Sequence, residues 1–202
     1  MSANVTFSWN SVEGRTEIAA IIEANVPQWR TGARQAQIES WSHTLAGIDV
    51  ILIASTGWGK TTAFFIPIFI LHHLLKNPHP RIPKHRASHP VALVVTPLIE
   101  LGNAHAIEIT EFGMAAVSLT AEHLRSASLE GRDLVKEVLQ CRWPVVLLSA
   151  ERLLSPDVDK ILRDENFRRN LVLLGIDEAH VLDPWGKDFR QAYRQIGLLR
   201  NR

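Results

Sequence analysis

The feature of this sequence that most constrains its fold is a glycine-containing segment between two apolar runs. The segment Ala54-Ser-Thr-Gly-Trp-Gly-Lys-Thr-Thr62 follows the β-branched run 50–54 and precedes an apolar run that begins at Ala63. This order predicts a strand, a tight loop and a helix. Gly57 and Gly59 allow the backbone to turn its N–H groups toward a phosphate, and the helix N-terminus adds its positive dipole end. The segment therefore predicts a phosphate-binding loop.

The residue types in this loop suggest individual roles. We expect Lys60 to bridge the β- and γ-phosphates of ATP, and the Thr61 hydroxyl to be a hard oxygen ligand for Mg²⁺. Trp58 is bulky, so its side chain must point away from the phosphates, either packed on a neighbouring loop or exposed. Ala54 stands where such loops usually have a glycine. The nucleotide-binding residues expected in the loop are Ser55, Thr56, Gly57, Trp58, Gly59, Lys60, Thr61 and Thr62.

A second motif, Asp177-Glu178-Ala179-His180, follows the apolar run 171–176. Such a run predicts a strand buried on both faces of a parallel sheet, whose carboxyl end opens onto the ligand-binding crevice of α/β sheets. We expect Asp177 to hold Mg²⁺, directly or through water, and Glu178 to polarise the water that attacks the γ-phosphate. With Lys60, these two acids are the predicted catalytic residues. The alternative interpretation is two acids that merely begin a turn.

The pattern along the chain favours one α/β domain over residues 1–202. Apolar strand candidates alternate with segments of helical spacing, which predicts a mostly parallel sheet flanked by helices on both faces. The strand candidates are 50–54, 91–96, 116–120, 144–149 and 171–176; the helical ones include 18–26, 34–45, 98–112, 129–139 and 189–199.

Composition narrows the class of protein further. Cys141 is the one cysteine, which excludes an internal disulfide, and it is most simply a small packed hydrophobe. No apolar run is long enough to span a bilayer, so we expect a soluble intracellular protein without a membrane partner. The formal charge of +1 gives no global argument for nucleic acid, so any such contact must come from local residues.

Residues 76–90 contain four prolines and no apolar periodicity, which predicts an exposed loop. Its bases Arg81, Lys84 and Arg86 are candidates for a phosphate contact, although a solvated loop is the simpler interpretation. His85 and His89 have the spacing of half a zinc site, but no CxxC pair accompanies them.

The residues after the acidic motif carry a family resemblance. The stretch from Asp177 to Arg194 reads Asp-Glu-Ala-His-Val-Leu-Asp-Pro-Trp-Gly-Lys-Asp-Phe-Arg-Gln-Ala-Tyr-Arg. It resembles the RecQ-type DNA helicases, whose DEAH box continues into a Trp-Gly-x-Asp-Phe-Arg-x-x-Tyr aromatic loop. Three further segments resemble family elements in the same order along nearly the whole chain: Arg34-Gln-Ala-Gln37, Val95-Thr-Pro-Leu-Ile-Glu-Leu101 and Ser149-Ala-Glu-Arg-Leu153.

The resemblance implies a RecA-like P-loop NTPase domain that binds ATP with Mg²⁺ and contacts single-stranded or forked DNA. It places Gln37, together with Arg34, at the adenine. A Gln amide offers the hydrogen-bond donor and acceptor that this base requires. The alternative interpretation of Gln37 is an exposed helix residue. It places Thr96 and Pro97 on the nucleic-acid backbone, where the alternative for Thr96 is capping of the next helix. The aromatic loop supplies the remaining expected nucleic-acid contacts, which are Trp185, Lys187, Phe189 and Arg190.

The sequence also departs from the family pattern. Lys187 stands where a His is usual, and Asp183-Pro184 where Ser-Gln is usual. The resemblance implies a second RecA-like lobe that supplies arginine fingers, and we expect it to lie outside these 202 residues. We therefore expect the first lobe of an ATP-dependent helicase of DNA repair and recombination, moving 3′ to 5′, nuclear in a eukaryote, and completed by a second lobe in trans or in a longer parent. The alternatives are an RNA-dependent DEAD/DEAH-box ATPase and a truncated, non-catalytic nucleotide- or nucleic-acid-binding module.

Overall fold

The computed structural model describes residues 7–29 and 31–182. The chain divides into two compact units, Met1–His85 and Arg86–Arg202. The boundary lies within the proline-containing segment 76–90. Each unit has its own helices and its own buried side chains.

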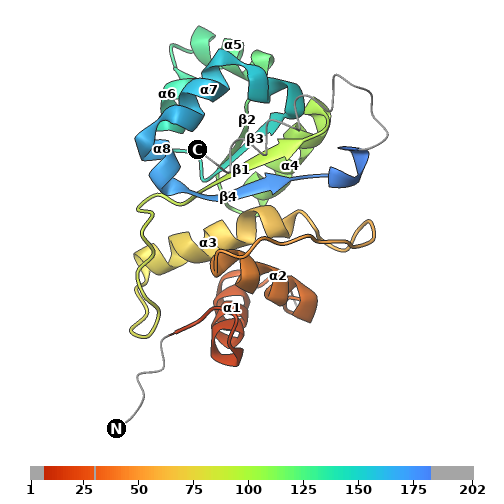
Figure 1. Ribbon diagram of the computed structural model, residues 1–202, viewed down its shortest axis with the longest axis vertical. Helices are drawn as coiled ribbons and strands as arrows, with labels where there is room; N and C mark the ends of the chain where they lie inside the picture. The colour runs from red at the N-terminus through yellow and green to blue at the C-terminus, as the bar shows by residue number, and fades with distance from the viewer. Residues whose placement is uncertain (1–6, 30, 183–202) are drawn as a thin grey trace. The chain divides into compact units, whose positions relative to one another are not determined.

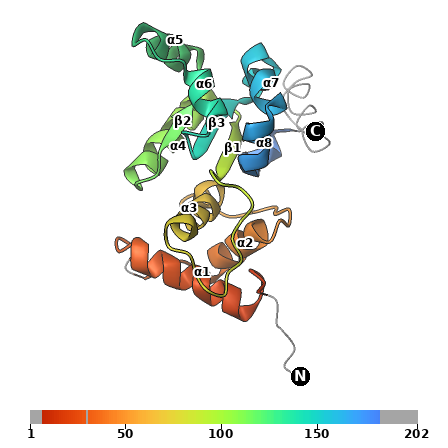
Figure 2. The same cartoon turned by 90° about the vertical axis from the view of Figure 1, so that its left-hand side faces the viewer.

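Three helices form the first unit, and they lie together in both views (Figures 1 and 2). They are α1 (Val12–Asn25), α2 (Gln35–Leu45) and α3 (Thr62–Lys76). The helix α1 begins at an N-cap, Ser11, whose hydroxyl accepts a hydrogen bond from the Gly14 N–H. Trp41 of α2 and Ile66 of α3 are completely buried, and the Trp29 ring stacks on Trp41 with centroids 6.1 Å apart. The apolar faces of the helices thus form the core of this unit.

The run 50–54 was predicted to be a strand, and this prediction is wrong. Residues 48–55 have no regular secondary structure, and the side chains of Ile51 and Ile53 are each 92% exposed. A strand exists only through hydrogen bonds to a neighbouring strand, and an apolar run does not specify that neighbour. The helix expected after the loop is present and begins at Thr62.

The second unit contains a parallel sheet of four strands in the order β2-β3-β1-β4. The strands are β1 (Val91–Thr96), β2 (Ala116–Ser118), β3 (Val145–Ser149) and β4 (Leu171–Ile176). They match four of the predicted strands, and the α/β prediction with a parallel sheet is confirmed. All of β1 is buried, as expected for an interior strand of a covered parallel sheet.

Helices cover both faces of this sheet (Figure 1). One face presents Leu93 and its register partner Val146 to a core shared with the helices after β2. The other face presents Leu147, whose Cβ lies 3.9 Å from where a Cβ of Gly102 on the helix α4 would be. The helices of the unit are α4 (Ile99–Glu111), α5 (Ala121–Leu129), α6 (Leu134–Leu139), α7 (Pro156–Arg163) and α8 (Glu165–Asn170), with short 3₁₀ turns at Ala150–Leu154 and Ala179–Leu182.

Two details of the helical prediction need correction. The segment predicted as one helix over 129–139 is divided, because α5 ends at Leu129 and α6 starts only after Asp133, which caps it by accepting from the Lys136 N–H. The helices α7 and α8 were not predicted, although Ser155 and Asp164 cap their N-termini through their side chains. Cys141 is buried in the core of this unit, as expected.

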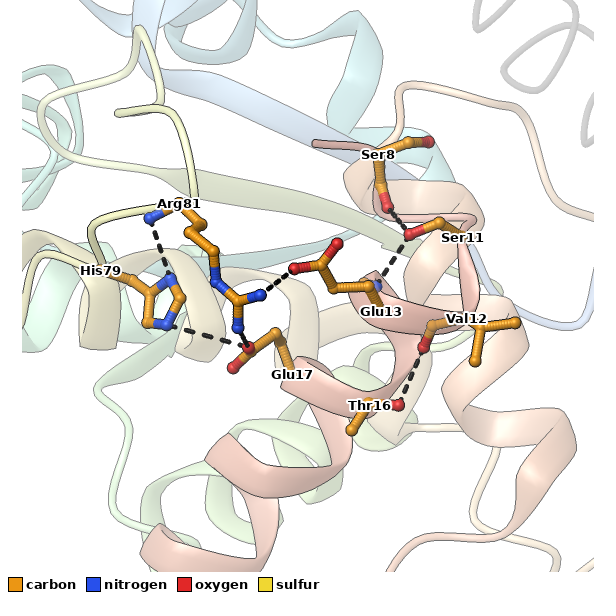
Figure 3. A network of polar contacts seen from close by, with 9 residues as sticks. Ser8, Ser11, Val12, Glu13, Thr16, Glu17, His79 and Arg81 are labelled. Carbon is orange, nitrogen blue, oxygen red and sulfur yellow. Dashed lines mark hydrogen bonds and ion pairs between the residues drawn. The ribbon is translucent and has the colours of Figure 1, made fainter. Parts of the chain in front are cut away.

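The segment after α3 is tied to α1 by charge (Figure 3). The Arg81 guanidinium forms ion pairs with Glu13 and Glu17 of α1, and His79 Nε2 lies 3.8 Å from Glu17. The next residue, Ile82, is buried, whereas the Arg81 side chain is largely exposed. The guanidinium considered for a phosphate contact is therefore paired with carboxylates of its own unit. In the part of the chain described here, no helix is long and apolar enough to cross a membrane.

Candidate nucleotide and nucleic-acid site

Both glycines of the predicted phosphate loop have the positive φ angles that a tight turn requires. Gly57 and Gly59 have φ angles of 76° and 91°, which side-chain-bearing residues rarely adopt. The Lys60 ammonium donates to the carbonyl oxygens of Ala54 (2.9 Å) and Ser55 (3.0 Å). These acceptors are neutral, so the positive charge of Lys60 is not neutralised by these hydrogen bonds.

The loop has donors and space that fit a nucleotide phosphate. A Cβ added at Gly57 would meet no other atom within 4 Å, so the loop is open at this point. The loop runs directly into α3, whose first residue is Thr62. The Thr62 hydroxyl turns back to the Gly59 carbonyl at 2.6 Å, and Thr61, half-buried, occupies the N-cap position. Ser55 and Thr56 are exposed on the same loop.

Two side chains from the start of α2 hold the loop at Trp58. The Arg34 guanidinium donates to the Trp58 carbonyl at 2.9 Å and lies 6.0 Å from the centre of its ring. Gln37, which is only 7% exposed, accepts from the Arg34 N–H at 2.9 Å and donates to the Trp58 carbonyl at 3.3 Å. The structure therefore brings Arg34 and Gln37 together with the predicted phosphate loop.

The acidic motif lies at the carboxyl end of β4, in the second unit. The backbone N–H of Asp177 donates to the Val95 carbonyl at 2.8 Å, so the ladder between β1 and β4 continues into the motif. Glu178 has φ 49°, a left-handed conformation that is rare outside glycine and often marks functional turns. Its carboxylate is partly exposed and lies 3.0 Å from His180 Nδ1. Both residues are partly buried, and the side chain of Glu178, at 39% exposed, is more accessible than that of Asp177, at 13%.

The Asp177 side chain has a partner that the sequence did not predict. His105 of α4 approaches it with Nε2 2.8 Å from Oδ2, and each side chain is only 13% exposed. Burial lowers the pKa of His105, but the hydrogen bond and charge of Asp177, helped by Glu108, outweigh it and raise the pKa above the ordinary 6.5. Because 72 residues separate the pair, no local pattern could have identified it.

A divalent cation that carries a nucleotide is a chemical fit for these groups. Mg²⁺ prefers hard oxygen ligands and is often bound by one or two carboxylates together with substrate phosphates, not by a cage of protein ligands. Each unit offers one such group by itself, a hydroxyl of Thr61 in the first and a carboxylate of Asp177 in the second. Within residues 7–29 and 31–182, no cluster of three or more His, Cys, Asp or Glu side chains is arranged to hold a metal.

The expected nucleic-acid contacts fall partly within the structure. Thr96, the last residue of β1, is fully buried, and its hydroxyl donates to the Leu98 carbonyl at 3.0 Å. Pro97 is also buried, whereas Leu98 and Ile99 at the start of α4 are 48% and 45% exposed. Trp185, Lys187, Phe189 and Arg190 lie outside the described residues.

The fold and these motifs define a class of protein domain, the RecA-like P-loop lobe. The family model of the DEAD/DEAH box helicases matches residues 34–201. The chain therefore belongs to the DEAD/DEAH box helicase family.

Curated relatives narrow the resemblance to one branch of the family. The chain is 30% identical over 156 residues to the ATP-dependent DNA helicase RecQ of Synechocystis, covering 77% of this chain and 28% of that protein. It is 29% identical over 171 residues to the ATP-dependent helicase wrn-1 of Caenorhabditis elegans, covering 85% of this chain and 14% of that protein. The chain is thus homologous to the ATP-binding lobe of RecQ-family helicases and spans less than a third of each of these two relatives.

A solved structure gives the same fold assignment. The DEAD-box helicase Mss116, bound to single-stranded RNA and a UDP-BeF nucleotide analogue, aligns with 92% of this chain at a TM-score of 0.58 and 26% identity. The alignment covers 35% of the Mss116 chain. The expected RecA-like helicase fold is confirmed by this similarity.

Proposed function

We propose that this chain is the ATP-binding lobe of a RecQ-like DNA helicase, which hydrolyses ATP with Mg²⁺ and uses it for 3′-to-5′ movement on single-stranded DNA. The observation that carries the proposal is the acidic pair at the end of β4. One carboxylate, Asp177, is held in the interior by His105, and the next, Glu178, is turned outward by a left-handed backbone. A structural turn has no need of this separation, whereas a cation ligand and a water-polarising base require different environments.

The nucleotide is proposed to bind at the glycine loop. Lys60 exchanges its carbonyl partners for phosphate oxygens, which are stronger acceptors because they are charged. Thr61 and Asp177 supply oxygen ligands to Mg²⁺, and this cation neutralises charge on the phosphates when it is bound. Glu178 polarises the attacking water. Arg34 and Gln37 support the loop from the base side, where Gln37 has one further amide hydrogen for adenine.

The nucleic-acid strand is proposed to lie at the start of α4 and on the aromatic loop. Thr96 is buried, so the groups offered there are backbone atoms and the exposed surface of Leu98 and Ile99. Such contacts position a strand without reading its sequence. Trp185 and Phe189 are proposed to stack on unpaired bases, with Lys187 and Arg190 at the phosphates. The proposed DNA substrate implies a nuclear location in a eukaryote.

Translocation is proposed to need a second RecA-like lobe, in a longer parent or in trans. Arginine fingers from a neighbouring element raise phosphoryl-transfer rates by about 10³ to 10⁵ in related NTPases. By itself this lobe should therefore bind ATP and hydrolyse it slowly.

The test is steady-state ATP hydrolysis by the purified chain at low salt, with and without single-stranded DNA. We expect a low rate that DNA increases and that both Lys60→Ala and Glu178→Gln abolish. Glu178→Gln should bind a fluorescent ATP analogue as wild type does, whereas Lys60→Ala should bind it more weakly. A rate that Glu178→Gln leaves unchanged would instead indicate a contaminating ATPase and a non-catalytic binding module.

A second candidate function is RNA-dependent ATP hydrolysis. It is favoured by the similarity to a DEAD-box structure that contains single-stranded RNA and opposed by the Trp185–Tyr193 stretch, which resembles the RecQ aromatic loop. Matched DNA and RNA oligonucleotides of one sequence distinguish the two. Stronger stimulation by RNA would replace DNA with RNA as the substrate.

A further inference from the structure

The His105–Asp177 contact joins two elements that the proposed reaction uses differently. Asp177 follows β4, and His105 lies in the middle of α4, which begins directly after the proposed nucleic-acid segment at Thr96 and Pro97. The Nε2–Oδ2 distance is 2.8 Å, and both side chains are 13% exposed. At this distance and burial the contact is a charge-assisted hydrogen bond shielded from water.

Both carboxylate oxygens of Asp177 have a defined partner. Oδ2 accepts from His105, and Oδ1 accepts from the Glu178 N–H at 2.9 Å. The backbone of Asp177 is fixed by its hydrogen bond to the Val95 carbonyl. The contacts with Glu178 and Val95 are made by backbone groups. Among these three partners, His105 is therefore the one whose side chain orients the Asp177 carboxylate.

His105 is itself held in place. Its Nδ1 lies 3.6 Å from Glu108 Oε2, one helical turn further along α4. The helix is anchored on the sheet at Gly102, because a Cβ there would lie 3.0 Å from Thr96 Oγ1 and 3.3 Å from Ser118 Oγ. The imidazole is thus linked to α4 through Glu108 as well as through its own backbone, so a shift of this helix would change the hydrogen bond to Asp177.

We propose that His105 is a positioning residue that orients the Asp177 carboxylate for the divalent cation and makes this orientation depend on the position of α4. The inference rests on the proposed function, because it assumes that Asp177 is a cation ligand. Partners that orient a metal-binding carboxylate typically change metal affinity by 10- to 100-fold when removed. No proton transfer through His105 is involved.

The experiment measures how Mg²⁺ strengthens the binding of a fluorescent ATP analogue to the full chain. His105→Ala removes the donor, His105→Leu removes it while filling the space, and His105→Gln keeps an amide donor. The matched control is His123→Leu, because His123 of α5 bonds only a backbone oxygen, that of Ser118 at 2.7 Å, through its ring. Binding of Mn²⁺, followed by electron paramagnetic resonance, gives a second readout that does not depend on turnover.

We expect His105→Ala and His105→Leu to raise the half-saturating Mg²⁺ concentration about tenfold or more. Affinity for the analogue without metal should stay unchanged, His105→Gln should recover most of the loss, and His123→Leu should behave as wild type. A wild-type Mg²⁺ requirement in His105→Leu would overturn the inference, as would an equal loss of affinity with and without metal. If the wild-type chain binds no nucleotide at all, the proposed function fails, and the inference fails with it.

Discussion

The phosphate loop makes a quantitative prediction through its two glycines. Both have positive φ, so replacement by alanine should cost about 1–2 kcal/mol of stability at either position. A Cβ at Gly57 meets nothing within 4 Å, whereas a Cβ at Gly59 would lie 2.8 Å from Gln37 Nε2. The amide must then move and lose its bond to the Trp58 carbonyl, which is worth about 1 kcal/mol. Gly59→Ala should therefore cost about 2–3 kcal/mol, roughly 1 kcal/mol more than Gly57→Ala.

The assay is urea unfolding of the nucleotide-free chain, followed by the summed fluorescence of its six tryptophans, in a double-mutant cycle with Gln37→Ala. In the Gln37→Ala background the amide is absent, so Gly57→Ala and Gly59→Ala should become equally costly. The packing of Gln37 against the loop would be refuted if Gly57→Ala and Gly59→Ala lowered the free energy of unfolding equally in the wild-type background. It would also be refuted if their difference persisted in the Gln37→Ala background. Circular dichroism at zero urea checks that each variant retains its helices.

Three further predictions concern charged groups. Lys60→Ala should weaken binding of a fluorescent ATP analogue roughly tenfold to a hundredfold, because a charge-assisted hydrogen bond is worth about 1.5–3 kcal/mol; unchanged affinity would exclude the loop as the phosphate site. Arg81→Ala should lower the free energy of unfolding by at most about 1 kcal/mol, because the ion pairs of Arg81 are exposed. Thermal denaturation with and without 1 M salt measures this loss, which should be smaller in salt because salt screens the ion pairs. In metal-free buffer, NMR titration should give His105 a pKa above 6.5, because the hydrogen bond and charge of Asp177, with Glu108, outweigh the opposing effect of burial; Asp177→Asn should lower this pKa. A raised folded-state pKa means that the stabilisation is complete below pH 6.5 and is lost as pH rises through the folded-state value.

The parallel sheet could be predicted because its strands follow continuous apolar runs. The strands β1 and β3 are buried throughout, as such runs predict, whereas β4 at the end of the strand order is mostly only partly buried, unlike the strand buried on both faces that its run predicted. The runs at 91–96 and 171–176 are continuous and apolar, and the structure gives both with those bounds. The same criterion failed at 50–54, since apolar content gives no partner strand. The position of Asp177 at a strand end followed from the sequence, because a polar motif directly after such a run must lie at the edge of the sheet.

Long-range partners could not be predicted from local patterns. His105 contacts Asp177 only because β1 and β4 are neighbours, which places the helix after β1 beside the end of β4. Strand order is a property of the whole sheet, so the residues around His105 in the sequence do not indicate which strands are neighbours. Arg81 is a similar case, because its position in a proline-containing segment suggested solvent or phosphate, and its actual partners are carboxylates 64 or more residues earlier.

Trp58 shows how an unusual residue is accommodated in a phosphate loop. The sequence required only that its ring point away from the phosphates, and the structure places the ring within 6.0 Å of the Arg34 guanidinium. The Trp58 carbonyl accepts hydrogen bonds from both Arg34 and Gln37. Three contacts from Arg34 and Gln37 thus hold the ring and the carbonyl of Trp58. Its backbone N–H donates to the Ser55 carbonyl at 3.3 Å within the loop. The loop can therefore carry a bulky side chain between the two glycines, because the ring and the carbonyl are held by α2 and the segment before it.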